Sequence, residues 1–155
     1  MTTDDDIKYD RSLLGISNLL GQFQVTAQMI LDFAESCGET NPVHSDEAMA
    51  KESEFGSLIA PPTFCNVFVN GLSRPDIKLE YGDIGFFAGQ AIESHAPIRP
   101  GDTLNATTKL KDVYAKTGRS GKMVFAVWET IFSNQNDEDV ARVQESYVRR
   151  NSRKK

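Results

Sequence analysis

Residues 56–75 read GSLIAPPTFCNVFVNGLSRP, and this stretch decides the fold. Pro61 and Pro62 can occupy the cap and the first turn of a helix, where no backbone donor is missed. The residues after them place apolar side chains at helical spacing, with one that widens the apolar arc: Phe64, Val67, Phe68, Val69, Gly71 and Leu72. The pattern predicts a mostly buried helix over residues 62–72, of about three turns, that ends near Pro75.

From about residue 86 the pattern changes to that of β-strands. Four segments separated by turn sequences are predicted as strands, 88–97, 103–115, 122–133 and 139–150, and a fifth is expected near 20–25. The segment KMVFAVWETIF at 122–132 is apolar on both alternations. It is therefore predicted to be a central strand covered on both faces, with Phe125, Trp128 and Phe132 in the core. The predicted helices lie in the first half of the sequence and the long antiparallel strands in the second half. This order predicts an α+β domain, with the sheet wrapped around the apolar helix.

A second helix is predicted before the polar stretch GETNPVHSDE at 38–47. Thr26 can cap its N-terminus, and the apolar side chains that follow have the spacing of one helical face: Ala27, Ile30, Leu31 and Ala34. Gly38 lies where a glycine commonly ends a helix. The polar stretch therefore begins at a helix end, where side chains can point into a cleft. A short helical segment is expected after it, around 46–54.

Length and composition describe one ordinary domain. The chain has 155 residues, of which 39% are hydrophobic and 25% charged. No run approaches the ~20 apolar residues of a membrane-spanning helix. We expect an N-terminal extension at 1–19, a single domain at 20–150 and a basic tail at 151–155. The N-terminus MTTDDDIKYD is acidic where a signal peptide would be basic, so a cytoplasmic location is expected.

Charge and cysteine usage narrow the classes of partner. Five of the 17 basic residues lie in residues 149–155, so 12 remain elsewhere against 22 acidic residues. Such an acidic body disfavours a nucleic-acid-binding face. Cys37 and Cys65 have no spacing typical of a zinc site, so we expect reduced thiols and no metal. Asp102, in the sequence RPGD, is expected to have a structural role in a turn.

Three stretches in a fixed order, FAESCGETNPVHSDEAMA at 33–50, LIAPPTF at 58–64 and PIRPGDTL at 97–104, resemble the MaoC-like hot-dog hydratases and dehydratases. The resemblance is to the N-terminal or FAS1-like branch, and TGRSGKMVFAVWET at 117–130 extends it. It implies a hot-dog fold, an antiparallel sheet curled around the helix at 62–72. It also implies a dimer whose sheets join edge to edge, with the acyl tunnel between them.

The resemblance implies an activity as well. These proteins add water to trans-2-enoyl thioesters of coenzyme A or acyl carrier protein, giving (R)-3-hydroxyacyl products, or run the reverse reaction. No metal and no redox cofactor is implied, since coenzyme A or the carrier protein enters as part of the substrate. The acyl chain length, the choice between coenzyme A and carrier protein, and the pathway stay open.

The family's loop, Asp-x-Asn-Pro-x-His, falls on Glu39, Asn41, Pro42 and His44. The resemblance implies that His44 is the main acid/base group, that Glu39 helps it to hold one water, and that Asn41 and Pro42 orient the loop. Glu39 departs from the family by one methylene. That methylene could move the carboxylate by about 1 Å, and such a displacement can lower the rate about a hundredfold.

A second departure concerns the donor to the thioester oxygen. Active members have His-Gly at the start of the central helix, where this chain has Pro61 and Pro62. Proline has no N–H, and losing one such donor typically lowers the rate about 10²–10³-fold. The N–H or hydroxyl of Thr63 is the candidate replacement. Asn66 and His95 are candidates for lining the substrate site, although either could have a purely structural role.

Two functions from different classes therefore remain open. The first is an enoyl-thioester hydratase or 3-hydroxyacyl dehydratase that acts as a homodimer. The second is a subunit without useful chemistry of its own, which supplies acyl-tunnel wall to a catalytic hot-dog partner in a heterodimer. A thioesterase is disfavoured, because hot-dog thioesterases place their carboxylate on the central helix and residues 62–72 contain no Asp or Glu.

Overall fold

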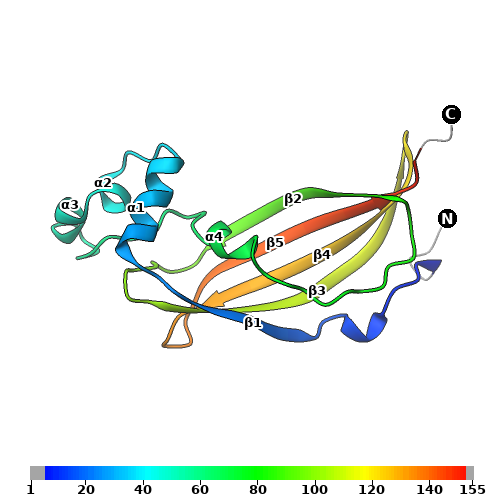
Figure 1. Ribbon diagram of the computed structural model, residues 1–155, viewed down its shortest axis with the longest axis horizontal. Helices are drawn as coiled ribbons and strands as arrows, with labels where there is room; N and C mark the ends of the chain where they lie inside the picture. The colour runs from blue at the N-terminus through cyan, green and yellow to red at the C-terminus, as the bar shows by residue number, and fades with distance from the viewer. Residues whose placement is uncertain (1–5, 153–155) are drawn as a thin grey trace.

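The computed structural model describes residues 6–152. Residues 1–5 of the predicted extension and 153–155 of the predicted tail lie outside this range. The described chain forms one five-stranded antiparallel sheet in the order β1-β3-β4-β5-β2 (Figure 1). The strands are β1 (Ser17–Gln24), β2 (Ile84–Ser94), β3 (Thr103–Gly118), β4 (Gly121–Ser133) and β5 (Asp139–Arg150). The predicted α+β fold class and all five predicted strands are confirmed.

Three helices gather at one end of the long sheet, and a fourth lies over one face of it (Figure 1). They are α1 (Ala27–Ser36), α2 (Pro42–Ser45), α3 (Glu47–Lys51) and α4 (Asn66–Val69). The prediction for α1 is confirmed at its start, because the Thr26 hydroxyl accepts the Met29 N–H at 3.1 Å. A short 3-10 helix at Arg11–Leu13 precedes β1. Within residues 6–152, no helix combines the length and apolar character needed to cross a membrane.

The central helix is shorter than its predicted range of 62–72. Only Asn66–Val69 is α-helical, and turns flank it on both sides. Several bonds here join residues three apart, such as Phe64 N–H to Pro61 O and Val67 N–H to Phe64 O, both at 3.0 Å. Helical spacing correctly predicted that Phe64 and Phe68 are buried, but the prediction for Val67 is wrong, because it is 46% exposed. However, no side chain caps α4, and the segment is rich in β-branched and aromatic residues, which lose rotamer freedom in helices.

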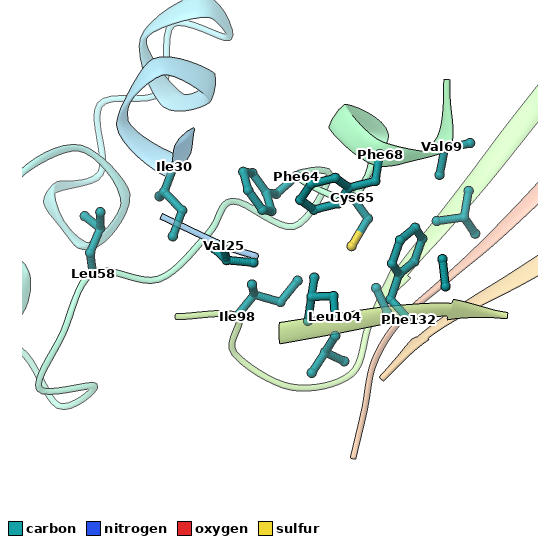
Figure 2. Close-up of a cluster of buried hydrophobic side chains, with 14 of the residues drawn as sticks. Val25, Ile30, Leu58, Phe64, Cys65, Phe68, Val69, Ile98, Leu104 and Phe132 are labelled. Atoms are coloured by element: carbon teal, nitrogen blue, oxygen red, sulfur yellow. The ribbon is translucent and has the colours of Figure 1, made fainter. Parts of the chain in front are cut away.

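Aromatic packing fixes this short segment against the sheet. Phe64 and Cys65 are almost fully buried in a cluster that also holds Val25, Ile30 and Leu104 (Figure 2). Further along the segment, the Phe68 ring stacks on Phe23 with centroids 4.5 Å apart and meets the Phe64 ring edge-on at 5.6 Å. The cluster joins the helical end of the molecule to the sheet, so the loop after α1 is held in a fixed position.

The other end of the sheet has its own core around Trp128, Leu110 and Ile77. The prediction for Trp128 and Phe132 is confirmed, since both are buried. The prediction for Phe125 is wrong: it is only partly buried and stacks on Tyr114, with centroids 5.0 Å apart. Successive side chains of a strand point to opposite faces, so Phe125 lies on the face of β4 opposite Trp128. The apolar run concealed that alternation.

Candidate functional site

The polar loop begins at the end of α1. Gly38 has φ +68°, and its N–H donates to Glu35 O at 3.0 Å, while the Glu39 N–H donates to Ala34 O at 2.8 Å. These two bonds form a Schellman cap, which satisfies carbonyls that the end of a helix leaves unpaired. The cap reverses the chain within two residues. It thereby fixes the backbone of Glu39, the first residue of the predicted site.

Side chains of the loop hold its own backbone. The Glu39 Oε1 atom accepts the Asn41 N–H at 2.9 Å, and Asn41 Oδ1 accepts the Val43 N–H at 3.2 Å as the N-cap of α2. Pro42 occupies the first turn of α2, where its missing N–H leaves no bond unmade. The structure thus brings Glu39, Asn41, Pro42 and His44 together in one tightly bonded turn.

His44 is 9% exposed, and its Nδ1 atom lies 2.8 Å from the carbonyl oxygen of Ile59. A carbonyl oxygen only accepts, so Nδ1 carries the proton and donates it. In the neutral ring, Nε2 is then a free acceptor, and it has no partner among residues 6–152. A second bond, from the Ile59 N–H to Val43 O at 3.0 Å, ties the same two segments together. The loop is therefore fixed beside the segment 58–64.

The backbone of that segment leaves one donor available. The N–H groups of Ile59, Ala60 and Phe64 donate to Val43 O, Ile98 O and Pro61 O. Pro61 and Pro62 have no N–H. Thr63 is exposed, and its N–H donates to no residue in the described chain. Among residues 59–64, the Thr63 N–H is therefore the backbone donor that could form a hydrogen bond to an incoming oxygen atom.

Asn66 opens a separate, polar pocket of about 430 Å³, which we name the Asn66 pocket. It lies between α4 and strands β2 and β5, and its other lining residues are Asn70, Phe87, Gln90, Glu145 and Tyr147. His44 is not among them. The structure therefore assigns Asn66 to a cavity beside the central helix.

No hydrogen bond or ion pair of the described chain joins His95 to the loop. It lies just after the end of β2 rather than within a strand, and it is exposed. Its backbone N–H donates to Val140 O at 2.8 Å, and its ring Nε2 atom is 3.2 Å from Glu93 Oε2. A role in lining the substrate site stays a prediction.

The loop around PIRPGD has partners within the chain. The Asp102 carboxylate accepts the Arg99 N–H at 2.8 Å and the Gln135 amide at 3.0 Å, which confirms its role in the turn. The Arg99 guanidinium donates to Phe55 O at 2.5 Å and to Ser57 Oγ at 2.7 Å. Arg99 thus ties the segment before the central helix to this turn.

A buried polar cluster of Arg74, Glu145 and Tyr147 was not predicted. Arg74 and Glu145 form an ion pair with side-chain exposures of 12% and 4%, and the Tyr147 hydroxyl bonds to both. One sequence signal could have found it. Glu145 shares the inward face of β5 with Val143 and Tyr147, because residues two apart in a strand point to the same side. A charge that is buried on that face needs a partner.

The sequence model of one family matches residues 13–143 of the chain, and its description is "FAS1-like, dehydratase domain region". Among curated proteins, a UPF0336 protein of Streptomyces avermitilis is 29% identical over 101 residues, 62% of this chain and 67% of its own. The 3-oxo-4,17-pregnadiene-20-carboxyl-CoA hydratase alpha subunit of Mycobacterium tuberculosis is 30% identical over 141 residues, 79% of this chain and 43% of its own.

Two solved structures share the fold. The MaoC-like dehydratase of Rhodospirillum rubrum superposes with a TM-score of 0.68 at 23% identity, covering 91% of this chain and 94% of that one. The Mycobacterium tuberculosis HadBC complex, a (3R)-hydroxyacyl-ACP dehydratase, gives 0.70 at 18% identity, with 90% and 98% covered. The architecture described above is therefore the hot-dog fold of the MaoC-like dehydratases.

Proposed function

Because this chain belongs to the FAS1-like dehydratase domain region family, we propose that it is an (R)-specific enoyl-thioester hydratase or 3-hydroxyacyl-thioester dehydratase. The substrate would be an acyl-CoA or an acyl carrier protein thioester. The observation that supports the proposal best is the tautomer of His44. Its Nδ1 proton is committed to Ile59 O, so Nε2 is left as the base that hydration requires.

In the hydration direction, His44 Nε2 takes one proton from a water molecule while the water oxygen bonds to C3 of the enoyl thioester. The C2=C3 electron pair moves toward the thioester and negative charge develops on its carbonyl oxygen. The proton held on Nε2 is then delivered to C2, which returns His44 to its neutral form. Glu39 Oε1 is held by the Asn41 N–H, so the second carboxylate oxygen of Glu39 would accept a hydrogen bond from the other water hydrogen, which stays on the oxygen in the product hydroxyl. Asn41 and Pro42 would keep both groups in place.

The Thr63 N–H would donate to the thioester oxygen as charge develops there. Two observations support this role. The Thr63 N–H has no partner in the described chain, and two hydrogen bonds at Ile59 tie the segment 58–64 to the loop that carries His44. One such donor typically contributes about 10²–10³-fold to the rate, so it would offset the two prolines. Asn66 would line the path of the acyl chain.

Assembly is proposed to occur through β2. This strand is at the edge of the sheet, and Phe86 and Phe87 on it are 44% and 50% exposed. An unpaired, apolar edge strand is a template for pairing with a second sheet. The partner would be a second copy of this chain or another hot-dog subunit, and the HadBC complex supports the second possibility.

The alternative function is an acyl-binding subunit without chemistry of its own. Two observations favour it. One Glu39 oxygen is already bonded to its own loop, and Pro61 and Pro62 offer no donor to the thioester. Such a subunit would be inactive alone and active when expressed with a hot-dog partner that carries an intact aspartate/histidine loop.

The test is hydration of trans-2-butenoyl-CoA by the purified chain, followed as loss of the enoyl-thioester absorbance. We expect turnover, with (R)-3-hydroxybutyryl-CoA as the product on chiral analysis. An (S) product would contradict the proposed specificity. Folded protein that converts no enoyl thioester of coenzyme A or carrier protein, across several chain lengths, would reject the enzyme and favour the subunit.

A further inference from the structure

Positive charge is concentrated at the end of the sheet that lies away from helices α1–α3 (Figure 1). Two segments meet there, the β3–β4 hairpin at 114–125 and the end of β5 at 146–152, and Met123 pairs with Arg150 between them. They contain no Asp or Glu and five basic residues, which we name the cationic end: Lys116, Arg119, Lys122, Arg149 and Arg150. The chain as a whole has a net charge of −5, so this end has the opposite sign.

The charges of the cationic end are not neutralised by the chain itself. None of its five residues has an ion-pair partner among residues 6–152. Two carboxylates lie in the adjoining segment 80–83, and both have partners of their own. Asp83 accepts the N–H and the hydroxyl of Ser152 at 2.5 and 2.6 Å, and Glu80 pairs with Lys8 at 3.9 Å. The five positive charges are therefore available to an acidic partner.

Contacts within the chain hold two of these side chains in place at the surface. Lys116 Nζ lies 5.3 Å from the ring centre of Tyr114 and 5.7 Å from that of Phe125, and Lys116 is exposed. Arg149 is also exposed, and its Nε donates to Tyr81 O at 3.1 Å. Side chains that are already ordered lose less conformational entropy when a partner binds. The cationic end is thus prepared for contact with another surface.

The proposed assembly through β2 brings the cationic end to a candidate site. β2 runs from Ile84, which pairs with Arg150, to Ser94, at the end of the sheet where the helices gather (Figure 1). In a symmetric dimer that continues the sheet with all helices on one face, the two β2 strands are antiparallel. The cationic end of one subunit then lies beside the helical end of the other, which carries the His44 loop.

We propose that the cationic end binds an acidic surface of an acyl carrier protein. The carrier's thioester would then enter the site at the helical end of the partner subunit. Naming the carrier protein rests on the proposed function, because that function requires a thioester to be delivered. Complementary charge at such a surface favours the correct partner and speeds its association.

The shape and the charge distribution favour a protein over two other anions. Arg119 lies in the exposed turn between β3 and β4, and a hairpin tip protrudes, whereas small molecules bind in concave sites. Coenzyme A alone is therefore a poorer match than a carrier protein. A nucleic acid is an extended polyanion, and beyond the cationic end it would meet a chain with 22 acidic residues.

The test measures binding of holo-acyl carrier protein, which bears the prosthetic arm without an acyl group, by isothermal titration calorimetry. We expect saturable binding to the wild type that weakens as salt is added. In the double variant Lys116→Gln, Arg119→Gln we expect binding at least about tenfold weaker, because two charges at the contact are lost. Undiminished affinity in this variant, or no saturable binding by the wild type, would overturn the proposal.

The double variant Lys8→Gln, Lys51→Gln is the matched control. It removes the same two charges from exposed positions outside the cationic end. Its affinity for the carrier should equal that of the wild type, and an equal loss in both double variants would mean that only net charge matters, which would contradict the proposal. A random-sequence DNA duplex that binds the wild type more tightly than the carrier does would assign the surface to nucleic acid and overturn it too.

A second measurement needs no variant. A carbodiimide joins carboxylates to the lysine amines that contact them, and mass spectrometry of the wild-type complex locates the new amide bonds. We expect bonds from the carrier to Lys116 and Lys122. Bonds to Lys51 or Lys109 in their place would overturn the proposal.

Both measurements are independent of turnover, so the two proposals can fail separately. A chain that hydrates trans-2-butenoyl-CoA and binds no carrier protein would reject the docking surface and keep the proposed function. An inactive chain that binds the carrier at the cationic end would do the reverse.

Discussion

At the scale of single residues, burial has opposite chemical consequences for His44 and Cys65. His44 is buried, yet Ile59 O fixes its tautomer and leaves Nε2 without a partner in the described chain. Cys65 is buried in the aromatic cluster, and desolvation of the thiolate raises the pKa of its thiol to about 12. Burial thus leaves the first residue with one unpaired ring nitrogen in the described chain and makes the second an inert part of the core.

The two cysteines should therefore differ in reactivity. At pH 8 we expect a thiol-specific reagent to modify the exposed Cys37 and leave Cys65 intact, because only the thiolate reacts and Cys65 stays protonated. The native chain should take up one equivalent, and the unfolded chain two. Counting released chromophore with and without denaturant measures this, and two fast equivalents in the native state would contradict the burial.

The pKa of Cys65 also predicts a pH dependence of stability. Its value is raised in the folded state, from 9.0 to about 12, so the stabilisation from the buried neutral thiol is complete below pH 9 and is lost as pH rises toward 12. Chemical unfolding of wild type and Cys65→Ala at several pH values tests this. We expect the advantage of the wild type to shrink above pH 9, and a constant difference would refute the prediction.

Glu39 can be tested by shortening it. Glu39→Asp should keep the bond to the Asn41 N–H and move the carboxylate back by about 1 Å, which we expect to raise kcat by up to about a hundredfold. Glu39→Gln is the control, since it keeps the length and loses the charge, and it should lower kcat. A Glu39→Asp variant slower than wild type would show that the loop is built for glutamate.

At the scale of elements, the turn between α1 and α2 places the candidate site. Gly38 has φ +68°, a conformation that an L side chain adopts only with strain. We expect Gly38→Ala to lower the free energy of unfolding by about 1–2 kcal/mol and to reduce turnover, because the strained cap holds Glu39. Urea unfolding monitored by circular dichroism measures the first effect.

Gly89→Ala is the matched control. A Cβ at Gly89, like one at Gly38, would meet no atom within 4 Å, but its backbone lies outside the positive-φ region. The control should therefore be close to neutral in stability. Equal losses in both variants would mean that strain at the cap is not the cause.

Local periodicity predicted most of the elements, because strand alternation, capping residues and glycine stops act over a few residues. The bounds of β5 and the caps of α1 follow from such signals. The length of α4 did not follow, because packing of Phe64 and Phe68 holds the segment whether or not it is helical. Family resemblance supplied the residues of the loop, and it could not show where the Glu39 carboxylate points.

At the scale of the whole molecule, contacts between distant parts of the chain were beyond sequence reasoning. The Arg74–Glu145 pair joins residues 71 positions apart, and only the antiparallel order of the sheet brings them together. The same order leaves β2 at an edge. Neither the ion pair nor the edge position of β2 could therefore be predicted before the complete fold was known.

Assembly through β2 gives a prediction at this scale. A charge on an edge strand opposes pairing with a second sheet, so Phe87→Lys should convert the proposed dimer into a monomer at micromolar concentration. Sedimentation velocity measures the change. Leu19→Lys, on the opposite edge strand β1 and 68% exposed, is the control and should stay dimeric. Dissociation by the β1 variant alone would assign the interface to the other edge.

The central claim is that His44 is the base, and the most direct measurement is kcat for trans-2-butenoyl-CoA hydration by His44→Ala beside His95→Asn. The chain has two histidines, and the second is exposed, paired with Glu93 and not bonded to any loop residue in the described chain. We predict a loss of about 10²–10⁴-fold for His44→Ala, as expected for a general base, and a change of a few-fold at most for His95→Asn. Undiminished turnover in folded His44→Ala would contradict the account.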